Sequence, residues 1–146
     1  MISAFKQLFA AETEAEQQNS LPLAALVLMF EVSRADGDID QSEIESLSDY
    51  ARQHLNVDEQ ELTAIIDEAR RSSDEAISLQ KFTQQICSAW DNQQRKSLLS
   101  YCWQVALADA HLDVHERHVI RKIAALLYLN EREIQSAKIE AQTRFG

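Results

Sequence analysis

The chain has 146 residues and carries 24 acidic against 14 basic side chains, which gives a formal net charge of −10. Proteins that bind nucleic acid need clustered Lys and Arg to neutralise phosphates, so this composition argues against nucleic acid as a partner. With only two Gly and one Pro, the chain has too few turn residues for a β fold. We therefore predict an all-α protein with a single domain over residues 1–146.

Several features bear on the cellular setting. The sequence contains no uninterrupted apolar run of the roughly 18 to 20 residues needed to cross a bilayer. The N-terminus also lacks the basic segment, apolar core and cleavage site of a secretion signal. Cys87 and Cys102 are isolated and form no Cys-x-x-Cys motif. These observations predict a reduced, cytoplasmic protein with buried thiols.

The N-terminal segment, residues 1–19, is predicted to form a helix of its own. Its apolar residues Phe5, Leu8 and Phe9 fall on one side of that helix. They predict either docking on the domain or contact with a partner, including a second copy of the chain. Contact with a membrane surface is the less favoured alternative, because interfacial helices carry many basic residues and this one has only Lys6.

The next predicted helix runs from Leu21 to about Ala35. It is apolar on all sides, so we expect it to be the central helix of its half of the domain. Its only charged residues are Glu31 and Arg34, three positions apart. Two interpretations stay open: the two side chains pair with each other, or Glu31 faces inward as a metal ligand.

This helix leads into a motif that occurs twice. Residues 35–43 read Ala-Asp-Gly-Asp-Ile-Asp-Gln-Ser-Glu, and residues 108–116 read Ala-Asp-Ala-His-Leu-Asp-Val-His-Glu, 73 positions later. The similarity continues on both sides, and past a one-residue deletion Val57 aligns with Leu129. Such an extended match predicts an internal repeat whose two units cover each other's apolar faces.

The predicted units are two pseudo-repeats of three helices each, over residues 21–71 and 93–142, within a compact bundle of seven to eight helices. Four of the predicted helix starts show Asp or Asn followed three residues later by Glu, the signature of a capping box. The pairs are Asp40 with Glu43, Asp58 with Glu61, Asp113 with Glu116, and Asn130 with Glu133. Ser78 and Asn92 are expected to start two further helices, and residues 72–75 to link the units.

The capping signature limits which motif acids are available for a site. Carboxylates in a capping box already bind backbone N–H groups, which leaves Asp36, Asp38, Asp109 and His111. Asp36 and Asp109 each follow the C-terminal end of an apolar helix, where the helix dipole disfavours negative charge. We therefore expect something positive nearby: a cation, an Arg or the N-terminus of a neighbouring helix. A hard-cation site that combines carboxylates of both turns is one hypothesis.

Two more specific ligand sites are rejected. Counted from the first Asp of the motif, a calcium loop would need Gly at the position of Gln41 and Glu at the position of Leu47. The aromatic residues Trp90, Tyr101 and Trp103 are interpreted as core and rim residues, not as a ligand cage.

Catalytic metal and nucleophile motifs are also missing. His111, His115 and His118 lie among acids, but His115-Glu116-Arg117-His118 is one residue too short for the His-Glu-x-x-His helix motif. Whether these three His residues take part in a site stays open. No Gly-x-Ser-x-Gly elbow and no phosphate-binding Gly loop occur. The sequence therefore predicts no catalytic residues and no enzyme.

The two motifs, each following an apolar helix, resemble the tellurite-resistance TerB family, whose pattern is Ala-Asp-Gly-x-Ile/Leu-x-x-x-Glu. The chain is also similar to the N-terminal domain of a membrane-anchored DnaJ-like co-chaperone. This resemblance covers about residues 21 to 142 and implies a helical bundle in a bacterial cytoplasm. It also implies a cation site formed by Asp36, Glu43, Asp109 and Glu116, with Asp38, Asp40, His111 and Asp113 as secondary candidates. Ala110 departs from the pattern, because it replaces the Gly of the motif.

Three functional hypotheses follow. The first is a non-catalytic, TerB-like binding module that responds to a divalent cation within a stress or tellurite-resistance-type assembly. The second is a protein-interaction or oligomerisation module without a metal site. The third and most distant is a metal-dependent hydrolase, which would require acids and His to converge on one open metal ion.

Overall fold

A computed structural model describes residues 21–35, 39–75, 78–108 and 114–145. This part of the chain forms seven helices and no strand, which confirms the all-α prediction. The first helix covers residues 21–34. The others are α2 (Gln41–His54), α3 (Glu59–Glu75), α4 (Gln80–Ala89), α5 (Asn92–Leu107), α6 (Val114–Leu126) and α7 (Glu131–Phe145). The N-terminal helix predicted for residues 1–19 lies outside the described residues, so its docking and contact roles stay predictions.

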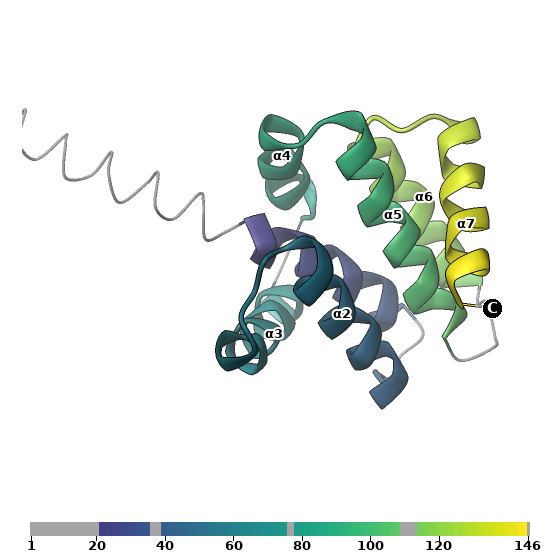
Figure 1. Ribbon diagram of the computed structural model, residues 1–146. Helices are drawn as coiled ribbons and strands as arrows, with labels where there is room; N and C mark the ends of the chain where they lie inside the picture. The colour runs from purple at the N-terminus through teal and green to yellow at the C-terminus, as the bar shows by residue number, and fades with distance from the viewer. Residues whose placement is uncertain (1–20, 36–38, 76–77, 109–113, 146) are drawn as a thin grey trace, which may run out of the picture.

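The helix over residues 21–34 is buried at the centre of the bundle, whereas its composition predicted a central place only within its own half of the domain. Every residue from Ala24 to Phe30 has no exposed surface, so all sides of this helix are covered. A helix that is apolar all round is stable in water only when it is surrounded in this way. In Figure 1 it is the purple helix that passes behind α2.

The other helices pack around this centre in two groups, α2 with α3 and α4 to α7, and the contact of α2 with α5 joins the groups. Helix α5 packs against α7, α6 and α2, while α2 packs against α3 and α4 packs against α6. Figure 1 shows α5 and α7 side by side on the right of the bundle and α3 at its lower left. Helix α5 contributes more buried apolar residues than α4, α6 or α7: Leu98, Leu99, Tyr101, Cys102, Trp103, Val105 and Ala106. Trp103 and Tyr101 are therefore core residues, as predicted.

Local capping explains where several helices begin. The side chain of Asp40 accepts a hydrogen bond from the Glu43 N–H at 2.9 Å, as expected for the start of α2. Asn130 and Glu133 form a complete capping box at the start of α7, with N–O distances of 2.9 and 3.0 Å. Helix α5 is capped by Asp91, one residue before the start predicted from the sequence.

Helix α3 is longer than predicted. Residues 72–75 were expected to link the two units, because Ser72 and Ser73 are weak helix formers. The helix instead continues to Glu75, so this expectation is wrong. Ser73 is buried, and its hydroxyl bonds to side chains of the central helix. These tertiary contacts outweigh the modest helix propensity of the segment.

Helices α2 and α6, which begin at the ends of the two motifs and are called the motif helices below, end in the same way. Asn56, shortly after α2, has a φ of 55°, and Tyr128, shortly after α6, has a φ of 59°. These two residues directly precede Val57 and Leu129, which the sequence comparison aligns. A left-handed residue after a helix allows the next N–H groups to bond to the last carbonyls. The helix ends thus agree with each other, while the internal duplication and its unit boundaries stay predictions.

Candidate functional site

The structure describes three of the eight candidate site residues. Glu43, Glu116 and Asp40 lie within described helices or beside them. The remaining candidates, Asp36, Asp38, Asp109, His111 and Asp113, lie outside the described residues. The cation site formed by the two turns therefore stays a prediction.

Glu43 and Glu116 occupy the last position of the two motifs, and both are buried. Glu43 lies in the first turn of α2 and is 1% exposed, while Glu116 lies in the first turn of α6 and is 0% exposed. Both side chains take part in interactions. Burying a carboxylate is costly unless other groups compensate for the lost water. The capping signature predicts that each Glu lies at a helix start, and a residue can cap a helix without being buried. The inward position of both Glu residues is therefore a feature that the sequence did not predict.

Asp40 has a different environment, because it is exposed and serves as the cap of α2. Its carboxylate accepts hydrogen bonds from the Ser42 hydroxyl at 2.7 Å and from the Glu43 N–H at 2.9 Å. These bonds, that of Ser42 first, lower the pKa of Asp40 below its usual value. The residue is thus already engaged at the helix start, as the capping signature predicts.

The end of the central helix is tied to α3 just before the first motif turn. The Ser73 hydroxyl donates a hydrogen bond to Glu31 Oε1 at 2.8 Å and accepts one from Arg34 Nε at 3.3 Å. Arg34 also forms an ion pair with Asp74. Glu31 and Arg34 therefore meet through Ser73, which differs from the direct pair considered above. Since Glu31 is held in this network, the structure favours a structural role for it over that of a metal ligand.

The three described histidines lie on two helices, His54 on α2 and His115 and His118 on α6, and His115 takes part in an interaction. His118 is exposed on α6, and His54 is exposed at the end of α2. Within the described ranges, no three residues of the His, Cys, Asp and Glu types are placed so that they could hold a metal ion. A cation site at the motif would thus have to include the turn residues that the structure does not describe.

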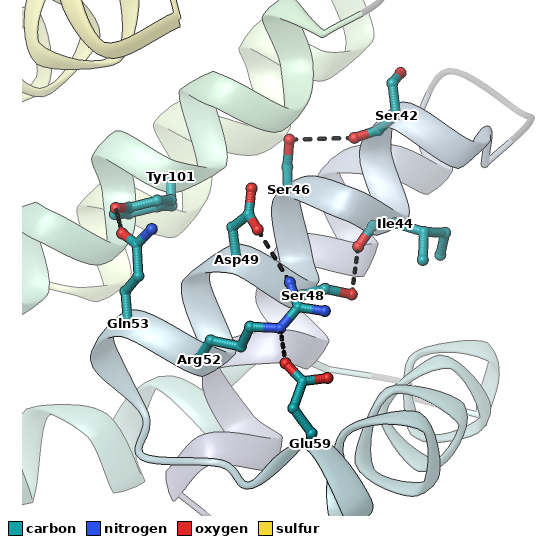
Figure 2. A network of polar contacts seen from close by, with 9 residues as sticks. All are labelled: Ser42, Ile44, Ser46, Ser48, Asp49, Arg52, Gln53, Glu59 and Tyr101. Carbon is teal, nitrogen blue, oxygen red and sulfur yellow. Dashed lines mark hydrogen bonds and ion pairs between the residues drawn. The ribbon is translucent and has the colours of Figure 1, made fainter.

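A polar and aromatic cluster joins three helices on another side of the bundle. The Tyr101 hydroxyl of α5 donates a hydrogen bond to Gln53 Oε1 at 3.1 Å and lies 3.0 Å from His54 Nε2, both on α2 (Figure 2 shows the Gln53 bond). The Arg144 guanidinium of α7 lies 3.7 Å from the centre of the Tyr101 ring. Sequence reasoning did not find this cluster, because no local spacing connects residues from three separate helices.

Helix α2 carries further polar contacts on the side that meets α3. Arg52 bonds to Asp49 at 3.1 Å and to Glu59 at the start of α3 (Figure 2). Both partners of Arg52 are exposed, so these pairs contribute little to stability. They lie beside a surface cavity of about 380 Å³ between α2 and α3. This cavity is lined by side chains of both charge signs, and none of the described candidates Asp40, Glu43 and Glu116 is among them.

A second surface cavity of about 480 Å³ lies between α4 and the end of α6. Its lining is mostly neutral and includes Gln80, Thr83 and Cys87. The Cys87 thiol bonds to the Leu126 carbonyl, with an S–O distance of 3.6 Å. None of the three described candidates, Asp40, Glu43 and Glu116, lines this cavity either.

The fold and the motif define the class of protein: a small all-helical domain with buried glutamates at the start of two helices. The comparison with protein families assigns it further. A family model described as "Tellurite resistance protein TerB" matches residues 22–139, which is most of the chain. The chain therefore belongs to the TerB family.

Two other comparisons returned no relatives. No curated protein and no solved structure matches the chain. Among the described helices, none combines the length and the hydropathy needed to span a membrane.

Proposed function

We propose that this protein is a non-catalytic binding module in a bacterial stress or tellurite-resistance-type assembly, and that a divalent cation bound at the motif turns regulates it. Membership of the TerB family supports the assembly type. The burial of Glu43 and Glu116 supports the cation, because both carboxylates lie inside a chain that is already strongly negative, with a net charge of −10. A bound cation would stabilise negative charge in such a place.

The residues assigned to the cation are Asp36, Glu43, Asp109 and Glu116. The sequence places Asp36 and Asp109 directly after helices, where negative charge is disfavoured by the helix dipole. Carboxylate oxygens are the ligands preferred by hard cations such as Ca²⁺ and Mg²⁺.

Cation titration tests this proposal. Thermal unfolding of the full chain is followed while Ca²⁺, Mg²⁺, Mn²⁺ or Zn²⁺ is added in turn. Binding at one site stabilises the folded state by about 2.7 kcal/mol when the ion is at 100 times its Kd. We expect such a rise in the unfolding temperature for at least one ion, and its loss in the variant Asp36→Asn/Asp109→Asn.

Glu45→Gln is the matched control. Glu45 is exposed on α2, two residues from Glu43, so its neutralisation should leave the response to the ion unchanged. Absence of a shift with every ion, together with equal unfolding temperatures of the native chain and Asp36→Asn/Asp109→Asn, would remove the cation from the proposal.

A cytoplasmic location is part of the same proposal. Cys87 and Cys102 are free thiols. Proteins in oxidising compartments tend to form disulfides, whereas free thiols are usual in the cytoplasm. Burial raises the pKa of the Cys102 thiol to about 12, which makes that residue a core side chain and not a reactive group.

The alternative proposal is a protein-contact module that acts through Phe5, Leu8 and Phe9 and needs no cation. The full-length variant Phe5→Ser/Leu8→Ser/Phe9→Ser separates it from the first proposal. Loss of a partner in pull-down experiments, with no response to any cation in the native chain, would favour this alternative. An intact cation response with unchanged pull-down would count against it.

A further inference from the structure

The charges of this protein are divided unequally along the chain. Residues 1–77 contain 17 acidic and 5 basic side chains, whereas residues 78–146 contain 7 acidic and 9 basic ones. The formal charges of the two parts are therefore −12 and +2. Because the first part includes α2 and α3 and the second includes α4 to α7, this division also separates regions of the folded bundle.

Among the described helices, α3 has the largest net negative charge, −4 of the −12. This helix carries six acids and only two bases, Arg70 and Arg71. Glu61, Glu68 and Glu75 are exposed and seven positions apart, so they lie along one side of the helix. None of the three forms an ion pair with another described residue. We call these three residues the acidic face.

Helix α6 has the opposite character. Its single acid, Glu116, is buried, and its exposed charged side chains are all basic. Arg117 and Lys122 make no ion pair with any described side chain, while Arg121 is bound to Glu131 at 2.7 Å. We call Arg117, Arg121 and Lys122 the basic face. The exposed Val114 at the start of the helix, 78% accessible, adds apolar surface beside it.

The two faces belong to different sides of the molecule. Helix α3 packs against α2, whereas α6 packs against α4 and α5. Figure 1 shows α3 at the lower left of the bundle and α6 on its right, behind α5. The acidic face of one copy is thus complementary to the basic face of another, while contact between two identical faces would bring like charges together.

We propose that copies of this chain associate head to tail, through contact of the acidic face of one copy with the basic face of the next. Such a contact is heterologous, so the assembly always keeps one free acidic face and one free basic face at its ends and can continue beyond a dimer. Because the charges are exposed, the contact is weak and is screened by salt. The proposal does not depend on cation binding at the motif.

Sedimentation velocity of the full chain in EDTA tests this association. At low ionic strength, about 0.02 M, the mean mass should rise above 16.6 kDa as the protein concentration increases. At about 0.3 M NaCl the Debye length is roughly half of its value at 0.1 M, and the mass should return to that of one chain. A constant mass of one chain at low ionic strength would overturn the proposal.

Neutralising the unpaired charges of each face separately, with Arg121 kept because it is bound to Glu131, gives the sharper test. The variants Glu61→Gln/Glu68→Gln/Glu75→Gln and Arg117→Gln/Lys122→Gln should each remain single chains when alone. An equimolar mixture should form a species of two chains and nothing larger, because each variant retains the face that the other lacks. Gln keeps the helix propensity of these residues, and circular dichroism verifies the fold.

The variant Lys81→Gln/Arg132→Gln is the control for a general effect of charge. It removes two exposed basic residues from α4 and α7, and it should associate like the native chain. A mixture of the two face variants that stays monomeric would overturn the head-to-tail contact. Association that persists in either face variant alone, or that is insensitive to salt, would also overturn it and would assign the contact to another surface.

Discussion

Single glutamates of this chain have very different environments although their local sequences are alike. Glu133 is part of a capping box, where its carboxylate accepts the Asn130 N–H at 3.0 Å. Glu43 and Glu116 each follow an Asp at the same spacing of three residues, yet both are buried. The spacing predicts a helix start in each case, but it does not determine whether the carboxylate faces water. Only the packing around the helix decides this.

The environment of His54 gives a prediction about pH. Partial burial, and second the positive charge of Arg144, lower the pKa of His54 below its usual 6.5. The folded state therefore binds fewer protons than the unfolded state at mildly acidic pH. The contribution of His54 to the free energy of unfolding is fully present above about pH 6.5, the pKa in the unfolded state. This contribution is lost as the pH falls through the lower pKa of the folded state. We expect the native chain to lose more thermal stability than His54→Gln between about pH 7.5 and 5.5.

Thermal unfolding followed by circular dichroism measures this difference, and His118→Gln is the control. His118 is exposed on α6, away from the cluster around Tyr101. Equal pH slopes for the native chain and His54→Gln would show that His54 does not contribute.

At the scale of helices, the ends are as informative as the starts. Asn56 and Tyr128 have positive φ angles after the two motif helices. Asn tolerates this conformation better than most residues, whereas an aromatic residue is uncommon there. The backbone conformation is thus required by the chain reversal, and Tyr128 takes it at some cost in free energy.

Replacement of Tyr128 by Gly should therefore stabilise the protein. We expect the free energy of unfolding to rise by about 0.5 to 1 kcal/mol, because Gly adopts positive φ without steric cost and the Tyr128 side chain, 78% exposed, loses little contact. Asn56→Gly should have a smaller effect. Ala125→Gly, at an exposed position inside α6, should instead destabilise by about 1 kcal/mol. Urea denaturation distinguishes these outcomes, and a loss of stability in Tyr128→Gly would contradict this account.

At the scale of the whole molecule, one continuous core joins the helices around the central one. Ile123 of α6 has no exposed surface, whereas Ile139 of α7 is 61% exposed. Deleting a buried side chain removes its transfer free energy and leaves a cavity. The same deletion on the surface removes little.

This difference predicts the outcome of two matched substitutions. Ile123→Ala should lower the free energy of unfolding by about 2 to 5 kcal/mol, whereas Ile139→Ala should change it by less than about 0.5 kcal/mol. Urea denaturation of the full chain measures both. Similar losses for the two variants would mean that Ile139 is covered in solution, for example by another copy.

Much of the fold could be predicted from the sequence, because helix formation depends on residues three or four positions apart. The apolar run from Ala24 to Phe30, the capping pair Asn130 and Glu133, and the scarcity of Gly were sufficient for an all-α bundle with a buried central helix. The family resemblance carried by the two motifs is confirmed by the match over residues 22–139. The cation site and the duplication remain predictions.

The sequence by itself determined the helices, the charge of each segment and the family, since each of these depends on neighbouring residues or on composition. Only the tertiary structure decided that Ser73 extends α3, because its partner Glu31 is 42 residues away. It also decided that Glu43 and Glu116 are buried and that the two helices carrying the acidic and basic faces pack against different neighbours in the bundle. These features depend on which surfaces meet when distant helices pack, and no local pattern in the chain specifies that.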